Sequence, residues 1–223
     1  MNVFLPADIL IPDVESMEKW SVIACDQFSS QPEYWKDVKE TVGDDPSSFH
    51  LIFPEAELED VDENEKIKTI NWNMQSYLDQ GIFKKFEKSY VYVERTLKNG
   101  NIRRGVIGMI DLEAYDYSEN SSSRIRATEK TVTCRIPPRV RIREDAPVEL
   151  PHVLLLCDDR SDGLMEWLSG KKEEMRKLYN FNLMKEGGHI SGWLVSGKLA
   201  KDFEKQITSY ENISADMPYA VGD

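Results

Sequence analysis

A predicted β-hairpin is the local feature that most constrains how this chain can fold. Its two strands are expected over Ser89–Leu97 and Ile102–Leu112, both rich in Tyr, Val and Ile, with the pair Asn99-Gly100 between them. Aromatic and β-branched residues favour strands, and an Asn-Gly pair tolerates the positive φ angles of a type I′ turn. The pattern therefore predicts an antiparallel pair of strands against which the other elements must pack.

Helical periodicity is clearest after Asp62. Glu65 lies three residues beyond Asp62, as in a capping box, and the apolar residues that follow share one helical face. These residues are Ile67, Ile70, Met74, Tyr77 and Leu78. Further helices are expected over Gln31–Val42, over Gly197–Tyr210, and after Ser161 as a helix cap.

Shorter apolar segments predict additional strands, and Val153–Cys157 has the composition of a buried one. The others are Trp20–Cys25, Ser48–Phe53, Tyr179–Met184, Ile190–Val195 and Tyr219–Val221. We therefore expect an α+β fold with mixed, largely antiparallel sheets and flanking helices. A polar stretch divides an N-terminal region, 1–117, from a C-terminal region, 124–223, although a single domain fits as well. The tryptophans expected in the core are Trp20, Trp35, Trp72, Trp167 and Trp193.

The composition argues against several classes of protein. A chain of 223 residues with 40% apolar and 30% charged residues can form a globular core. Its net charge of -12 argues against nucleic-acid binding, which needs a broad cationic face. No apolar run reaches the roughly 20 residues of a membrane helix, and the N-terminus lacks the basic start of a signal peptide, so we expect a cytoplasmic protein without a membrane partner. The three cysteines lack metal-ligand spacing and are expected to be reduced thiols.

A basic segment stands out in this acidic chain. From Arg124 to Arg143, seven residues are basic and only Glu129 is acidic. The basic residues are Arg124, Arg126, Lys130, Arg135, Arg139, Arg141 and Arg143. Guanidinium groups bind phosphate or carboxylate bidentately, so the segment predicts a site for a small anion. The alternative is that these arginines pair with the surplus carboxylates of the same chain.

The conformation of the basic segment bears on this site. Pro137-Pro138 argues against a continuous helix and against a central strand. Arg139, Arg141 and Arg143 alternate with apolar residues, so an extended chain would place three guanidinium groups on one face. That arrangement predicts one wall of an anion-binding groove.

Acidic residues at two places are candidates for catalysis. Glu129 could act as a general base or metal ligand, or could simply neutralise a basic neighbour. Asp158 and Asp159 follow a predicted strand, where open α/β sheets place ligand groups, and a carboxylate pair could hold magnesium. Turn and helix-capping chemistry explains the same two aspartates equally well.

His189 and Cys25 are further candidates from residue chemistry. His189 follows Gly187-Gly188 and could approach phosphate from a backbone loop, while a hairpin turn also explains the glycines. The string Cys25-Asp26-Gln27 lies where a predicted strand ends. Cys25 could be a nucleophile if a base lies near it, and is otherwise a buried structural thiol.

Longer strings carry a family resemblance. They are Cys25-Asp26-Gln27-Phe28, Ser30-Gln31-Pro32-Glu33-Tyr34-Trp35, Arg126-Ala127-Thr128-Glu129, Arg135-Ile136-Pro137-Pro138-Arg139-Val140-Arg141, Glu149-Leu150-Pro151-His152-Val153, Gly187-Gly188-His189-Ile190 and Tyr219-Ala220-Val221-Gly222-Asp223. Together they resemble the bacterial and archaeal family called domain of unknown function 1015, over nearly the whole chain. Through these strings the resemblance adds His152 and Asp223 as candidate site residues.

The resemblance implies a function only indirectly. Some members carry a label of kinship with the ParB and sulfiredoxin group, whose relatives include nucleotide-dependent phosphotransferases. That label rests on a box of the type Asp-Gly-His/Asn-His, which in similar proteins follows directly after the segment matching Tyr219–Asp223. Because family members are typically longer, this chain is expected to be a truncated N-terminal half.

Two hypotheses about function follow. The first is an enzyme that transfers or hydrolyses phosphate on a nucleotide or small metabolite, using ATP or ADP with magnesium and requiring the missing half. In it the arginines bind the anion, and Glu129 or Asp158 assists the reaction. The second is a noncatalytic sensor or interaction module, in which the same arginines bind a small anionic ligand or the acidic face of a partner.

Overall fold

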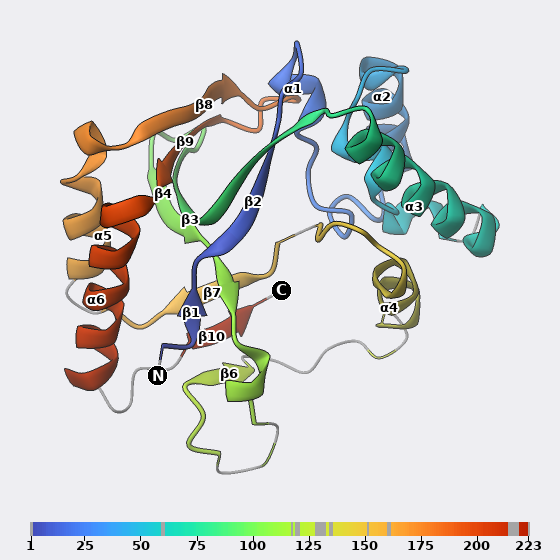
Figure 1. The fold of residues 1–223 in the computed structure, drawn as a ribbon. Helices are drawn as coiled ribbons and strands as arrows, with labels where there is room; N and C mark the ends of the chain where they lie inside the picture. Colours follow the sequence, from blue (N-terminus) through green and yellow to red (C-terminus); the bar gives the residue numbers. More distant parts are fainter. Residues whose placement is uncertain are drawn as a thin grey trace.

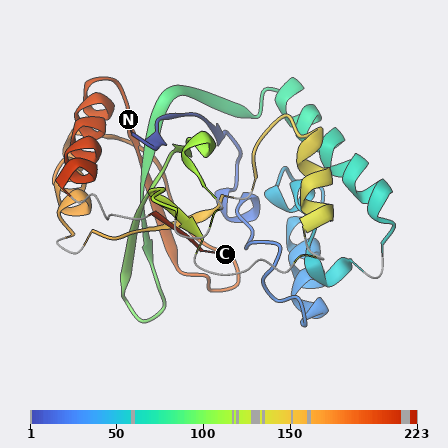
Figure 2. The same ribbon diagram turned by 90° about the horizontal axis from the view of Figure 1, so that it is seen from below.

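A central antiparallel sheet separates two groups of helices in the computed structural model (Figure 1). The structure describes residues 2–58, 61–116, 118, 121–127, 133, 136–150, 152–159, 162–213 and 219–222. Helices α5 (Gly163–Ser169) and α6 (Gly197–Ile213) lie on one side of the sheet. On the other side lie α1 (Met17–Trp20), α2 (Pro32–Val42), α3 (Glu63–Asp79) and α4 (Ile136–Glu144), a separation also seen from below in Figure 2. The expected α+β class is confirmed.

Strand β3 (Phe83–Thr96) organises the central sheet because it pairs with three other strands. Its first half pairs with β2 (Ala7–Pro12), and its second half lies between β4 (Ile102–Ile107) and β9 (His189–Val195). Strand β8 (Arg176–Asn182) completes the sheet beside β9. The predicted hairpin of β3 and β4 and the predicted pair of β8 and β9 are confirmed. Strands from the expected regions 1–117 and 124–223 thus share one sheet.

The turn between β3 and β4 differs from the expected type I′. Gly100 has a φ of 82°, whereas Asn99 is not among the residues with positive φ. The Gly100 N–H donates to the Leu97 carbonyl at 2.9 Å, and the Leu97 N–H donates to the Asn101 carbonyl at 2.8 Å. One left-handed glycine therefore closes a slightly longer loop, in which the Asn99 side chain accepts a hydrogen bond from the Asn101 N–H.

Two small sheets lie below the central one. Strand β1 (Phe4–Leu5) pairs with β5 (Met109–Ile110). Strand β10 (Tyr219–Gly222) lies between β6 (Ile125–Ala127), to which it is parallel, and β7 (Leu154–Cys157), to which it is antiparallel. The predicted strands at β7 and β10 are confirmed, but the expected burial of β7 is wrong. Leu154 and Leu156 are 61% and 59% exposed, whereas Leu155, which points to the opposite face of the strand, packs partly buried against Val3 and Ile125.

The helices begin in different ways. The Asp62 carboxylate accepts a hydrogen bond from the Glu65 N–H at 3.0 Å, which confirms the predicted start of α3. Helix α2 begins with a proline in its first turn and ends before Gly43, as expected. The expected cap of α5, Ser161, lies outside the described residues. The Leu164 N–H of α5 instead donates to the Asp159 carboxylate at 2.8 Å.

The predicted strands Trp20–Cys25 and Ser48–Phe53 are wrong, and buried serines account for both. Trp20 ends helix α1, and a 3₁₀ turn occupies Ser48–Leu51. The Ser48 hydroxyl donates to the Trp20 carbonyl at 2.7 Å and accepts from the Val22 N–H at 3.3 Å. The Ser47 hydroxyl accepts from the Phe49 N–H. Side-chain hydrogen bonds thus replace the ladder that a strand would have made.

Helix α4 corrects the expectation of an extended basic segment. Pro137-Pro138 occupies the first turn of this helix, where a missing N–H breaks no intrahelical hydrogen bond. The alternation of arginines after it therefore does not place all three on one face. Because successive odd positions are about 200° apart around a helix, Arg141 points away from the face that Arg139 and Arg143 share.

The core lies on both faces of the central sheet. Tyr90 and Tyr92 of β3 pack with Trp193 of β9 against α5 and α6. On the opposite side, one cluster surrounds Trp35 and another surrounds Trp20. Burial is thus confirmed for Trp20, Trp35 and Trp193, while Trp167 packs partly buried against the first cluster. The expectation for Trp72 is wrong: it is 69% exposed, on the outer side of α3.

Among the described residues, no helix has the length and apolar character needed to cross a membrane.

The turn between β8 and β9 gives a direct test of this fold. Gly188 has a φ of +98°, and a Cβ there would lie 2.3 Å from the Thr96 carbonyl oxygen. We expect Gly188→Ala to lower the free energy of unfolding, measured by urea denaturation, by about 1 to 3 kcal/mol. The control is Gly105→Ala in β4, where the added methyl group meets nothing within 4 Å and less than about 0.5 kcal/mol is expected. Equal losses in the two variants would contradict the described turn.

Candidate functional site

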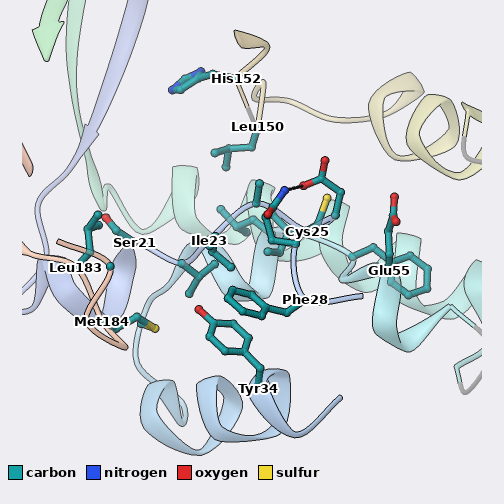
Figure 3. A pocket seen from close by; sticks show the side chains of 18 of the residues that line it. Ser21, Ile23, Cys25, Phe28, Tyr34, Glu55, Leu150, His152, Leu183 and Met184 are labelled. Atoms are coloured by element: carbon teal, nitrogen blue, oxygen red, sulfur yellow. Dashed lines mark hydrogen bonds between the residues drawn. The ribbon is translucent and has the colours of Figure 1, made fainter. Parts of the chain in front are cut away.

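A cavity of about 900 Å³ lies on the side of the central sheet opposite α5 and α6. One wall is the irregular segment Ser21–Phe28, and the facing walls are α4 and the turn Leu183–Gly187 between β8 and β9. Residues just before β7 form part of its rim. Figure 3 shows His152 and Leu150 on one side of this pocket and Phe28 with Tyr34 on the other.

Backbone hydrogen bonds hold the segment Ser21–Phe28 in place. The Cys25 carbonyl accepts from the Glu55 N–H at 2.8 Å, and the Gln27 carbonyl accepts from the Trp35 indole N–H at 3.2 Å. Trp35 is 2% exposed, so the second bond ties the segment to the core. The pocket wall is therefore fixed without belonging to a helix or strand.

The structure brings together several residues predicted from the sequence. Cys25, Asp26, Gln27, Arg139 and His152 all line this pocket. The first three belong to the irregular wall, whereas Arg139 of α4 and His152 of the rim lie more than a hundred residues further along the chain.

Arg139 joins two walls of the pocket. Its guanidinium donates to the Glu55 carboxylate at 3.0 Å and lies 3.8 Å from the Asp26 carboxylate. The Glu55 side chain is only 8% exposed, so this pair is partly shielded from water. Sequence reasoning missed Glu55, which lies in an acidic stretch and carries no signal that separates it from its neighbours. For Arg139 the structure thus supports the alternative of internal pairing.

The other arginines of α4 point to different partners. Arg141 donates to the Glu63 carboxylate at 2.6 Å and also to the Asn64 side chain, both at the start of α3. Arg143 donates to Glu149 at 2.8 Å. The expected single face of guanidinium groups is therefore wrong, because each side chain leaves the helix toward its own carboxylate.

Arg124 and Arg126 flank the start of β6 and do not line the pocket. The exposed Arg126 donates to the Ser123 carbonyl at 3.4 Å. Glu129, Arg135 and Asp223 lie outside the described residues, so the roles expected for them stay predictions.

Asp158 and Asp159 lie away from the pocket, at the end of β7. The hydrogen bond that Asp159 accepts from the Leu164 N–H is the helix-capping alternative given for this pair. Within the described ranges, no three His, Cys, Asp or Glu side chains gather as a metal site would require.

His189 is part of the ladder between β8 and β9. Its ring nitrogens lie 2.9 Å from the Asn182 side-chain oxygen and 3.1 Å from that of Asn180, both on the facing strand. It does not line the pocket, although the neighbouring Gly187 does. These contacts support the hairpin interpretation of the Gly-Gly-His string.

Arg95 is a pocket residue that sequence reasoning missed. Its guanidinium donates to the Gly187 carbonyl at 2.9 Å, and its buried Nε atom has no partner within the described part of the chain. Arg103 lies directly opposite on β4, and like charges at such positions repel. In the ranges that the structure covers, neither Arg95 nor Arg103 forms an ion pair with a carboxylate. The sequence marks Arg95 only by its position: it is a charged residue on the same face of β3 as the apolar Val91 and Val93.

Basic side chains outnumber acidic ones around the pocket. The basic residues are Arg95, Lys98, Arg139, Arg143 and Lys185, and the acidic ones are Asp26, Glu55 and Glu186. Four of these basic side chains pair with carboxylates, Lys98 with Glu186, Arg139 with Glu55, Arg143 with Glu149 and Lys185 with Asp37. The remaining lining is largely aliphatic and aromatic, so the pocket has an apolar body with cationic groups at its wall.

The environment of Cys25 disfavours a nucleophilic role. Burial raises the pKa of its thiol above the ordinary 9.0, and the nearby Asp26 and Glu55 raise it further, while Arg139 opposes them. The thiol is therefore protonated at neutral pH, which supports the alternative of a structural thiol. Partial desolvation at the pocket rim lowers the pKa of His152 below its ordinary 6.5, while the charge of Glu149 opposes this shift.

The fold and the pocket together define an α+β protein with a ligand-sized cavity, whose wall carries an arginine, Arg95, without a carboxylate partner in the described ranges. The chain belongs to the family described as "Protein of unknown function (DUF1015)", whose family model matches residues 9–223, so the expected family is confirmed. Comparisons with curated proteins and with solved structures found no match. Function is therefore argued from the pocket itself.

The raised pKa of Cys25 predicts slow alkylation. At pH 8, we expect iodoacetamide to modify Cys25 at least about tenfold more slowly than Cys157, which is exposed, because little Cys25 thiolate is present. Peptide mass spectrometry at several time points measures both rates, and 6 M urea as a control should bring them together. Faster modification of Cys25 than of Cys157 in the folded protein would contradict the described environment.

Proposed function

We propose that this protein binds a small organic anion in the pocket, of the class of phosphorylated metabolites or nucleotides. The main support for the proposal is the environment of Arg95. This partly buried cation lies in the pocket wall and has no carboxylate partner in the described ranges. A buried charge is unfavourable unless it is paired, and the opposing Arg103 adds to that cost. An anionic ligand in the pocket would compensate the charge of Arg95.

The shape of the pocket supports an organic ligand over a bare ion. A volume of about 900 Å³ is in the range of sites for molecules of nucleotide size. Its lining of aliphatic and aromatic side chains suits an apolar or aromatic body, with an anionic group directed to the basic wall. Binding of this kind fits a phosphotransferase and equally an anion-sensing module. We place it in the cytoplasm, in keeping with the free thiols Cys25 and Cys157.

Calorimetric titration with ADP at low salt, with and without magnesium, tests the proposal. We expect saturable binding to one site, weakened at least about tenfold in Arg95→Met, because a charged hydrogen bond contributes about 1.5 to 3 kcal/mol. Arg126→Met is the matched control, since Arg126 is an exposed arginine of the basic segment outside the pocket.

Three outcomes of this titration would contradict the proposal. The first is the absence of ADP binding both with and without magnesium. The second is an equal loss of affinity in Arg95→Met and Arg126→Met, which would indicate a diffuse electrostatic effect. The third is a larger loss in Arg126→Met, which would favour a site on the basic segment.

A further inference from the structure

The pocket contains a pair of stacked aromatic rings. The centroids of Phe28 and Tyr34 are 4.0 Å apart, and the two ring planes differ by 14°. Tyr34 rises from the first turn of α2 beneath the Phe28 ring, as Figure 3 shows. Both residues line the pocket. Stacked rings of this kind present a flat apolar surface.

Core packing does not account for the position of Phe28. Tyr34 packs against the buried cluster around Trp35, whereas Phe28 joins no core cluster of the described residues and is 36% exposed. Tyr34 covers one face of the Phe28 ring, so the exposed surface is what remains on the pocket side. Phe28 also has a φ of 53°, a left-handed conformation that is unfavourable for a residue with a bulky side chain.

The backbone around Phe28 is held in this unfavourable geometry by its neighbours. The Phe28 carbonyl accepts from the Gln31 N–H at 3.0 Å, and the preceding carbonyl of Gln27 accepts from the buried Trp35. Backbone strain that the surrounding structure fixes in this way is concentrated at ligand sites. The ring is therefore positioned before a ligand arrives.

We infer that the stacked Phe28 and Tyr34 form a platform for a planar aromatic ring carried by the anionic ligand. This inference rests on the proposed function and narrows it to phosphate compounds that bear a flat ring, such as a nucleobase. The ring of the ligand stacks at the Phe28 surface, and its anionic group meets the basic wall at Arg95. Ile23 and Met184, which lie toward the two rings in Figure 3, supply apolar contacts at the ring edge.

Matched ligands with and without a ring test this inference. We expect AMP to bind at least about tenfold more tightly than ribose 5-phosphate, since stacking of a base on an aromatic side chain contributes about 1 to 3 kcal/mol. Phe28→Leu should remove this preference and leave the affinity for ribose 5-phosphate within about twofold. Phe28→Tyr, which keeps a ring, should retain the preference.

Controls separate this inference from the proposed function. Trp72→Leu removes an exposed aromatic residue on α3, outside the pocket, and should leave both affinities unchanged. Equal affinities of AMP and ribose 5-phosphate for the wild type, both lowered by Arg95→Met, would overturn the platform and keep the anion site. Equal preferences in Phe28→Leu and Phe28→Tyr would also overturn it. If neither compound binds and ADP does not bind, the proposed function itself fails.

Discussion

The pairing of β3 with β2, β4 and β9 is the constraint on which the rest of this structure depends. Because β3 is 14 residues long, its first half can hold β2 while its second half lies between two other strands. The alternation of its side chains then separates the molecule into two sides. Tyr90 and Tyr92 face the cluster formed with α5 and α6, and Arg95 faces the pocket.

The pocket follows from elements that pack against this second side without extending the sheet. The irregular segment Ser21–Phe28 donates a hydrogen bond to the Ser48 hydroxyl and accepts one from the Trp35 indole N–H. Helix α4 is joined to this region through Arg139, which pairs with Glu55 and lies near Asp26. These contacts leave Arg95 with a carbonyl partner and no carboxylate in the described ranges. Arg139, which pairs with a carboxylate of the same chain, stabilises the pocket wall. Arg95, which has no such partner in the described ranges, is suited to bind a ligand.

Local sequence patterns predicted the elements whose structure is decided locally. The capping box at Asp62, the Asn99-Gly100 hairpin and the helix after Gly197 are each set by residues within a few positions. The predictions that were wrong concern segments whose structure depends on tertiary contacts or on where a residue lies within a helix. Ser48 replaces an expected strand ladder by bonding to residues more than twenty positions away, and Pro137-Pro138 starts a helix instead of excluding one.

In the candidate site, too, local sequence patterns predicted some features and missed those that depend on tertiary contacts. The strings that contain Cys25, Arg139 and His152 marked three parts of the pocket in advance, although they carried no information about their distances. The charge anomaly of the basic segment led to α4, but most of its described arginines pair or point elsewhere. Arg95 could not be found in this way, because its significance lies in the partner that its surroundings do not provide.

An NMR spectrum of the complex with AMP tests most directly whether Arg95 and Phe28 serve one ligand. The account predicts nuclear Overhauser contacts between the adenine protons and the Phe28 ring, together with a shift of the Arg95 Nε–H resonance, since that group has no partner in the described part of the chain. Adenine contacts confined to residues outside the pocket, with the Arg95 resonance unchanged at saturation, would contradict it.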